Sequence, residues 1–216
     1  MNLLTLPDSK LATFHRQAAA EIARRAKAAT NGYDAASIIH GNEMAKRALV
    51  VAAAGSHSIL FVGPPNCGKT MLRGVAFELG LGNTFEARPC PCGYHGSPIH
   101  ACNYSNGKIE RRRAAWPAAD ITVELVQPPQ RELNGRPGTG VAEMKAQIAS
   151  MSSHTDLSLD EHSVNLLKCA CVELGIDPDA RNRIIATART IANLDNSERI
   201  GPSHTCEAIN YRAFRR

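Results

Sequence analysis

A phosphate-binding pattern lies between Gly63 and Thr70, where Gly63 is followed by four residues and then by Gly68-Lys69-Thr70. Glycines let the backbone turn tightly, so that successive N–H groups and the start of the next helix can face negative charge. In this pattern the lysine reaches the β- and γ-phosphates of a nucleotide, and the threonine hydroxyl binds Mg²⁺. The pattern predicts a P-loop that binds ATP and Mg²⁺.

The elements that flank the loop have the order that a P-loop needs. The apolar run 58–63 predicts a buried strand entering it, and 69–81 predicts the helix that leaves it. A further helix is expected at 41–55, ended by Gly55. The alternative, a chance glycine-rich turn, is disfavoured by this strand–loop–helix context. Cys67 inside the loop is either a small filler residue or an oxidisable thiol.

Hydrolysis requires more than the loop, because an acidic pair on a second strand must hold Mg²⁺ and orient the attacking water. The strand predicted from Asp120 begins with its acid and ends at Gln127. Ligands in open α/β sheets lie at the carboxyl ends of the strands, so Asp120 is expected at the wrong edge. The Asp-Glu at 160–161 is better explained by a capping box formed by Ser158 and Glu161.

A cysteine-rich stretch follows the P-loop helix, and 83–107 is expected to be loop because Pro, Gly, Cys and His dominate it. Its candidate zinc ligands are Cys90, Cys92 and Cys102, with His95 and His100. Zinc takes four such ligands tetrahedrally, and only three thiols are present. An unliganded loop is therefore the favoured interpretation, and a zinc site is the alternative.

The run 108–116 places three arginines, Arg111 to Arg113, close to Trp116. Arginines beside an aromatic ring can bind and stack on single-stranded nucleic acid. A cluster of three charges is short for a binding tract, so a solvated helix face is favoured over DNA binding.

The whole chain has 216 residues, 44% of them apolar, and a formal charge of +5, which permits nucleic-acid contact without arguing for it. The N-terminus does not resemble a secretory signal, and no run approaches the roughly 20 apolar residues of a membrane helix. Seven cysteines show no disulfide framework, so the cytoplasm is expected, without a membrane partner. The expected divisions are a helical segment at 1–37, an α/β core at 38–133, a linker at 134–154 and a helical part at 155–216.

Helix signals fill both ends of the chain. The N-terminal segment predicts a helix at 9–30, and the C-terminal part predicts three. The first of these begins near Glu161, the second begins with Asp177 as cap and Pro178 at the first helical position, and the third follows Pro202.

Three stretches carry a resemblance to a known family: "GNEMAKRALVVAAAGSHSILFVGPPNCGKTML", "RPCPCGYHGSP" and "DARNRIIATARTIANLDNSERIGPSHTCEAINYR". Together they resemble the magnesium-chelatase-like AAA+ ATPases of the ComM/YifB group, over about residues 38–104 and 120–212. The resemblance implies a P-loop NTPase core of α/β class, shortened here, followed by an α-helical lid.

The resemblance also implies the site residues. The phosphate loop would comprise Gly63, Pro64, Pro65, Asn66, Cys67, Gly68, Lys69, Thr70 and Met71, with Thr70 on Mg²⁺. The segment approaching the adenine would comprise Ile39, His40 and Gly41. Arg181 matches the lid arginine called sensor 2, which reaches over the phosphates.

The chain departs from the family pattern where hydrolysis is concerned. The segment carrying the acidic Walker B strand is missing between the P-loop helix and the Pro-Cys-Pro-Cys run, and Arg88 stands where the family has its sensor 1 asparagine. No arginine lies between Trp116 and Asp120, where the family has one that serves a neighbouring subunit.

Three hypotheses for function remain. The first is an ATP-binding protein of this family with weak or absent hydrolysis, which could act on a full-length homologue. The second is an active ATPase or DNA helicase subunit, in a homo-oligomer or with a homologue, whose missing acidic site comes from another chain. The third is a DNA-binding module without nucleotide use.

Overall fold

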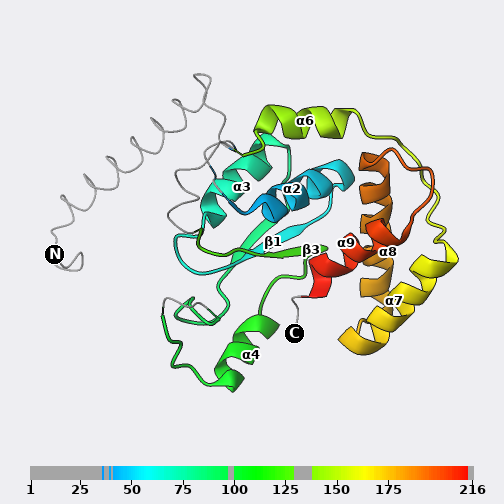
Figure 1. The fold of residues 1–216 in the computed structure, drawn as a ribbon. Helices are drawn as coiled ribbons and strands as arrows, with labels where there is room; N and C mark the ends of the chain where they lie inside the picture. Colours follow the sequence, from blue (N-terminus) through cyan, green and yellow to red (C-terminus); the bar gives the residue numbers. More distant parts are fainter. Residues whose placement is uncertain (1–35, 37–38, 40, 97–99, 129–137, 214–216) are drawn as a thin grey trace.

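The computed structural model describes residues 36, 39, 41–96, 100–128 and 138–213 (Figure 1). The helix predicted at 9–30 lies outside them. In chain order the elements are α2 (Glu43–Gly55), β1 (Ile59–Val62), α3 (Lys69–Glu78), β2 (Thr84–Ala87), α4 (Asn106–Ala114), β3 (Ile121–Glu124), α6 (Val141–Ala149), α7 (Glu161–Leu174), α8 (Pro178–Leu194) and α9 (Pro202–Ala213).

The three described strands form one parallel sheet in the order β2-β1-β3, so the strand that enters the P-loop is central. Phe61 lies opposite Glu86 on one side and Val123 on the other. Partners in register share a face of the sheet, because side chains alternate along each strand. The expected α/β class with a helical part is confirmed, and none of the described helices is both long and apolar enough to cross a membrane.

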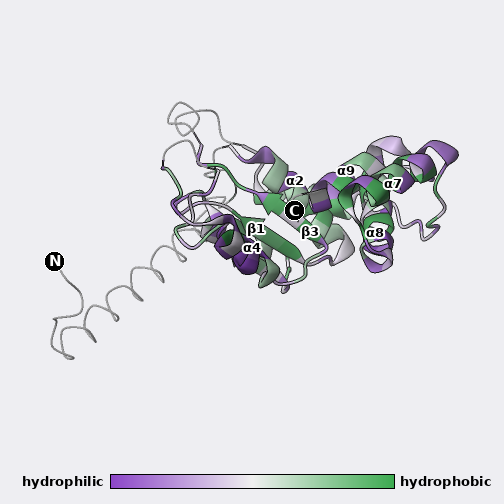
Figure 2. Ribbon diagram, turned by 90° about the horizontal axis from the view of Figure 1, so that it is seen from below, coloured by the Kyte–Doolittle hydropathy of each residue, from purple (hydrophilic) through white to green (hydrophobic). Residues whose placement is uncertain are grey.

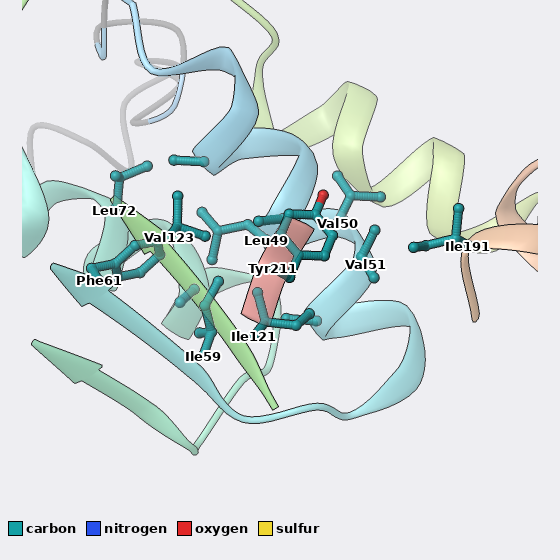
Figure 3. Packing of buried hydrophobic residues seen from close by; sticks show 14 of the residues in the cluster. Leu49, Val50, Val51, Ile59, Phe61, Leu72, Ile121, Val123, Ile191 and Tyr211 are labelled. Carbon is teal, nitrogen blue, oxygen red and sulfur yellow. The ribbon is translucent and has the colours of Figure 1, made fainter. Parts of the chain in front are cut away.

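One face of the sheet carries the main core, which α2 and α3 cover (Figure 3). Its central members are Leu49, Ile59, Phe61, Leu72, Ile121 and Val123. The same core continues into the C-terminal helices through Ile191 and Tyr211, so the two parts of the chain share one interior. The opposite face has a smaller cluster in which Trp116 packs on Leu60 and Val62.

The C-terminal helical domain, α7 to α9, packs beside the amino ends of the strands. Arg212 on α9 donates from Nη1 to the carbonyl oxygens of Ala119 (3.1 Å) and Asp120 (3.3 Å), just before β3. Asp120 in turn accepts from the backbone N–H of Ser58 (3.0 Å), just before β1. These bonds fix the helical domain to the edge where the strands begin.

Several sequence expectations were wrong in detail. Residues 84–87 were expected to be loop but form strand β2, because pairing with β1 supplies hydrogen bonds that no local pattern announces. The cap of α7 is Asp160, whose carboxylate accepts from the N–H of Ser163 at 2.7 Å, whereas Ser158 donates its hydroxyl to Asp156. Helix α6, whose Val141 and Met144 are buried, lies within the expected linker 134–154, and the position of the domain boundaries stays a prediction. The cap at Asp177 and the first-turn Pro178 are confirmed.

Candidate phosphate-binding site

The loop between β1 and α3 has a backbone that depends on two of its glycines. A Cβ added at Gly63 would lie 2.7 Å from both Cys67 Sγ and the carbonyl oxygen of Leu125, closer than side chains approach. Gly68, the residue before α3, has φ +93°, a left-handed conformation that residues with side chains rarely adopt. The loop therefore reverses tightly and aims the start of α3 at the carboxyl end of β1.

Lys69 folds back over this loop. Its Nζ donates to the carbonyl oxygens of Gly63 (2.9 Å) and Pro64 (2.6 Å) and lies 3.4 Å from Cys67 Sγ. The amine is thus held at the mouth of the loop by carbonyl groups of the loop itself. A phosphate oxygen would be a stronger acceptor for this cation, since hydrogen bonds between ionised groups are about twice as strong as neutral ones.

A cavity of about 590 Å³ opens beside the loop, within the range of small-molecule sites. It is lined by Pro65, Asn66, Gly68, Lys69, Thr70, Met71, Glu86, Ala87, Arg88 and Arg112. Six of these belong to the predicted phosphate loop. The other four come from the end of β2 and from α4, which sequence reasoning had not connected with the loop.

Two arginines of this cavity change how the sequence is interpreted. Arg88 had been noted only as a departure from the family pattern, and Arg112 only as part of a charged helix face. Both are exposed and line the same cavity as Lys69, so three cations of the described part of the chain line one opening. The strongly hydrophilic colouring of α4 in Figure 2 agrees with a helix that offers charge rather than apolar surface. No local signal in the sequence places Arg112 here, because 42 positions separate it from Thr70.

Among the described residues, Glu86 is the one acidic residue that lines the cavity. The Thr70 hydroxyl donates to its Oε2 at 3.5 Å, and Arg73 Nη1 lies 3.2 Å from its Oε1. Its register position opposite Phe61 puts it on the face of the sheet that α3 covers. Sequence reasoning missed this carboxylate because it looked for acids at strand ends, and Glu86 lies within a strand that it had predicted as loop.

No described strand ends in an acidic pair. β1 runs into Gly63, β2 into Arg88, and β3 ends with Glu124 followed by Leu125. Burial raises the pKa of the Glu124 carboxyl, and the nearby Arg113 partly opposes that rise. Glu124 shares a face with Val62, away from α3, and does not line the cavity.

Ile39, Gly41 and Arg181, which the resemblance assigned to the nucleotide site, do not line this cavity. Ile39 is buried in the main core, Gly41 adopts φ +71° ahead of α2, and His40 lies outside the described residues. Arg181 is exposed in the first turn of α8 and is not a lining residue. Its neighbour Arg183 has Nε 3.9 Å from Asp120 Oδ1, at the amino edge of the sheet.

Asp120 itself lies where the sequence predicted. It precedes β3 and bonds to Ser58, which precedes β1, so it is at the opposite edge of the sheet from the phosphate loop. This acid cannot reach an ion bound by Thr70 in this arrangement.

The three cysteines of the Cys-rich loop come together. Sγ of Cys92 lies 3.1 Å from Sγ of Cys90 and 3.6 Å from that of Cys102, and all three sulfurs lie within 4.8 Å of one another. The backbone N–H groups of Gly93 (3.1 Å) and His95 (3.3 Å) donate to Cys90 Sγ. Burial raises the pKa of the Cys90 thiol, but the hydrogen bonds from Cys92 and the backbone outweigh it and lower the pKa to about 7. A thiol that ionises readily is suited to binding a metal.

Neither predicted histidine joins this cluster. The grouping of side chains close enough to share an ion contains the three cysteines alone within the described residues. The His100 ring instead packs against Tyr94, with ring centroids 5.0 Å apart.

Comparison with known proteins identifies the family of the chain. The family described as magnesium chelatase, subunit ChlI, matches residues 35–80, and its C-terminal part matches residues 113–212. The two matches follow each other in the chain and cover both the phosphate loop and the helical domain. The chain belongs to the magnesium-chelatase-like family. This confirms the resemblance predicted from the sequence.

The chain is also similar in sequence to a characterised protein. The chain is 60% identical over 42 residues to the competence protein ComM of Haemophilus influenzae, which is 19% of this chain and 8% of that protein. The chain thus aligns with a small fraction of the relative's length. Residues 81–112, which supply Glu86, Arg88, Arg112 and the three clustered cysteines, lie between the two family matches.

Proposed function

We propose that this magnesium-chelatase-like chain binds ATP with Mg²⁺ and hydrolyses it very slowly or not at all. The observation that carries the proposal is the cavity at the phosphate loop, where Lys69, Arg88 and Arg112 face one opening. A triphosphate carries several negative charges, and backbone N–H groups with cations at a helix start are the usual means of holding it.

Weak hydrolysis follows from which groups surround that cavity. The loop, the helix start and the arginines act on the phosphates that are already charged in the bound nucleotide, so they favour binding. Turnover additionally needs a group that orients water. No described strand ends in the acidic pair that would do so.

The direct test is a titration with a fluorescent ATP analogue, paired with an assay of phosphate release. We expect saturable binding by the wild type, a loss of affinity of at least 100-fold in Lys69→Ala, and phosphate release well below 1 s⁻¹, the low end of ordinary turnover. Equal affinity in wild type and Lys69→Ala would overturn the nucleotide proposal. Turnover near 1 s⁻¹ that disappears in Lys69→Ala would overturn the proposal of weak hydrolysis.

An active enzyme remains the second hypothesis, since another chain could supply the missing acid. A copy of this chain or a full-length homologue would serve, as in ring-shaped assemblies. This hypothesis predicts that turnover per chain rises steeply with protein concentration or on mixing with the homologue. Concentration-independent turnover would exclude it for copies of this chain.

DNA binding by α4 is the third hypothesis. The structure assigns Arg112 to the cavity and leaves Arg113 half-buried near Glu124, so α4 offers DNA fewer free charges than its sequence suggested. A single-stranded oligonucleotide in the same titration tests this hypothesis, and its affinity should fall steeply with added salt if the contacts are electrostatic.

We also propose that Cys90, Cys92 and Cys102 hold Zn²⁺. Their sulfurs already lie close together, and backbone N–H groups support the most buried one. A water would complete the tetrahedron. Metal analysis should find one zinc per chain in the wild type and none in Cys90→Ser. Zinc-free wild-type protein with three freely titratable thiols would end this proposal.

A further inference from the structure

We infer that Glu86 is the metal-side carboxylate of the nucleotide site, binding Mg²⁺ together with Thr70 in place of an acid from a further strand. This inference rests on the proposed nucleotide binding. Glu86 lies within β2, whereas the acids that bind Mg²⁺ in P-loop proteins are expected at the end of a strand.

The sheet register fixes where Glu86 points. β2 pairs with β1 in parallel, so Glu86 is aligned with Phe61, whose side chain lies in the core beneath α2 and α3. On that face the carboxylate meets the first turns of α3. Its Oε2 accepts from the Thr70 hydroxyl at 3.5 Å, and both residues line the cavity beside Lys69.

The two oxygens suit magnesium. Mg²⁺ takes hard oxygen ligands in a nearly octahedral shell at about 2.0–2.1 Å, so neighbouring ligand oxygens lie roughly 3 Å apart. The hydroxyl and carboxylate oxygens at 3.5 Å are close to that separation before any ion is considered. When bound, the ion would neutralise the phosphates, and these two side chains would hold and orient it.

The competing explanation is a purely structural ion pair between Glu86 and Arg73. Oε1 of Glu86 is buried, yet Arg73 at 3.2 Å is not aligned to donate a hydrogen bond to it. The Arg73 side chain is 57% exposed, and exposed ion pairs are weak. Arg73 can therefore swing into solvent at little cost and leave the carboxylate to a metal.

An acidic pair has two tasks, to hold Mg²⁺ and to orient the attacking water, and a single carboxylate can perform only the first. Glu86 can bind the ion through its position next to Thr70, but the described part of the chain offers no second acid in the cavity lining to orient water. The inference therefore predicts magnesium-dependent binding without restoring rapid hydrolysis.

The test uses Mn²⁺ as a spectroscopic stand-in for Mg²⁺. Electron paramagnetic resonance reports the affinity of Mn²⁺ for the complex of the full chain with ADP. We expect Glu86→Gln to weaken Mn²⁺ binding about 10- to 100-fold, the usual cost of losing a group that holds a metal or its ligands. Without divalent ions, in EDTA, its affinity for ADP should equal that of the wild type or exceed it, because a negative charge near the phosphates has been removed.

Three further variants give the test its specificity. Glu124→Gln removes a carboxylate at the same edge of the sheet but on the other face, and should leave Mn²⁺ affinity unchanged. Arg73→Gln removes the ion pair and should leave that affinity unchanged or tighter. Glu86→Asp keeps the charge on a shorter side chain and should restore part of the affinity. Circular dichroism verifies that each variant is folded.

The outcomes separate the inference from the function on which it rests. If the wild type binds ADP and Glu86→Gln binds Mn²⁺ as tightly as the wild type, the inference is wrong and nucleotide binding stands. If Glu86→Gln does not fold, the comparison passes to folded Glu86→Asp and Arg73→Gln. If Arg73→Gln weakens Mn²⁺ binding as much as Glu86→Asp does, the ion pair rather than metal ligation explains the effect, and the inference is wrong. If the wild type binds no nucleotide with or without the ion, both are wrong.

Discussion

The two edges of the sheet use charged side chains differently. At the amino edge, Asp120 accepts hydrogen bonds from Ser58, while Arg212 donates to the backbone just before β3. At the carboxyl edge, Lys69 is bonded mainly to the carbonyl groups of its own loop, and Arg112 is exposed at a cavity. We call the first region the helical side, with residues 120 and 178–213, and the second the loop side, with residues 63–71, 86–88 and 112.

The difference shows how charge is divided between stability and function. On the helical side, Arg189 and Arg212 donate to acceptors within the chain, so removing either side chain leaves its acceptors unsatisfied. On the loop side, Lys69, Arg88 and Arg112 line one opening, and Lys69 is bonded to neutral carbonyl groups of its own loop. Charges of the second kind are available to a ligand, and their loss should affect binding more than folding.

The largest expected effect is a loss of stability on substitution of Arg189, which lies on the helical side. This buried arginine on α8 donates to the side chain of Asn193 and to the carbonyl oxygens of Ser197 and Glu198. Arg189→Met should lower the free energy of unfolding by about 3 kcal/mol, because several buried acceptors lose a charged donor. Urea denaturation measures this loss.

Its control is Lys168→Met, which removes an exposed charge on α7 and should change stability by less than about 0.5 kcal/mol. Folded Arg189→Met should still bind nucleotide with wild-type affinity. A large loss of affinity in folded Arg189→Met would break the division between the two sides.

Nucleotide should stabilise the protein through the loop side. A ligand at 100 times its dissociation constant adds about 2.7 kcal/mol to the free energy of unfolding. MgATP should therefore raise the melting temperature of the wild type and leave that of Lys69→Ala unchanged, which differential scanning fluorimetry can measure. An equal rise in both proteins would place the ligand away from the loop.

Arg112→Ala should weaken ATP binding about tenfold, which corresponds to about 1.4 kcal/mol, because one of three cations at the cavity is lost. Arg111→Ala is the matched control, since Arg111 is exposed on the same helix but does not line the cavity. Equal effects of the two substitutions would mean that α4 acts through its overall charge. Titration at two salt concentrations distinguishes the two explanations.

The smallest expected effect is the contribution of the Asp120 carboxyl to the dependence of stability on pH. Burial raises the pKa of its carboxyl, but hydrogen bonds from the side chain and backbone of Ser58 outweigh that and hold the pKa below its ordinary value. A depressed folded-state pKa gives stability that is complete above about pH 4 and is lost as pH falls further. Asp120→Asn should therefore reduce the acid sensitivity of unfolding by less than about 1 kcal/mol, because the group is partly exposed. Identical acid-unfolding curves would show that the ionised form contributes nothing.

Some features of the loop side could be predicted from the sequence because neighbouring residues determine them. The glycine spacing, the strand before Gly63 and the helix beginning at Lys69 are local, and the structure has all three. The same holds for the helical side at Asp177 and Pro178, where the cap and the fixed backbone angle of proline act within one turn. The two family matches include these segments.

Other features depend on contacts between distant segments. β2 becomes a strand only because β1 offers it hydrogen-bond partners, and that pairing turns Glu86 toward Thr70. Likewise, the packing of the chain brings Arg112 from α4 to the cavity. The hydrogen bonds of Arg212 hold the helical domain at the amino edge of the sheet. Arg181 belongs to that domain and does not line the cavity. The sequence by itself determined that there is a phosphate loop, because its backbone conformation is a property of consecutive residues. Only the tertiary structure decided which charges surround it, because side chains far apart in the chain meet only when sheet register and core packing bring them together.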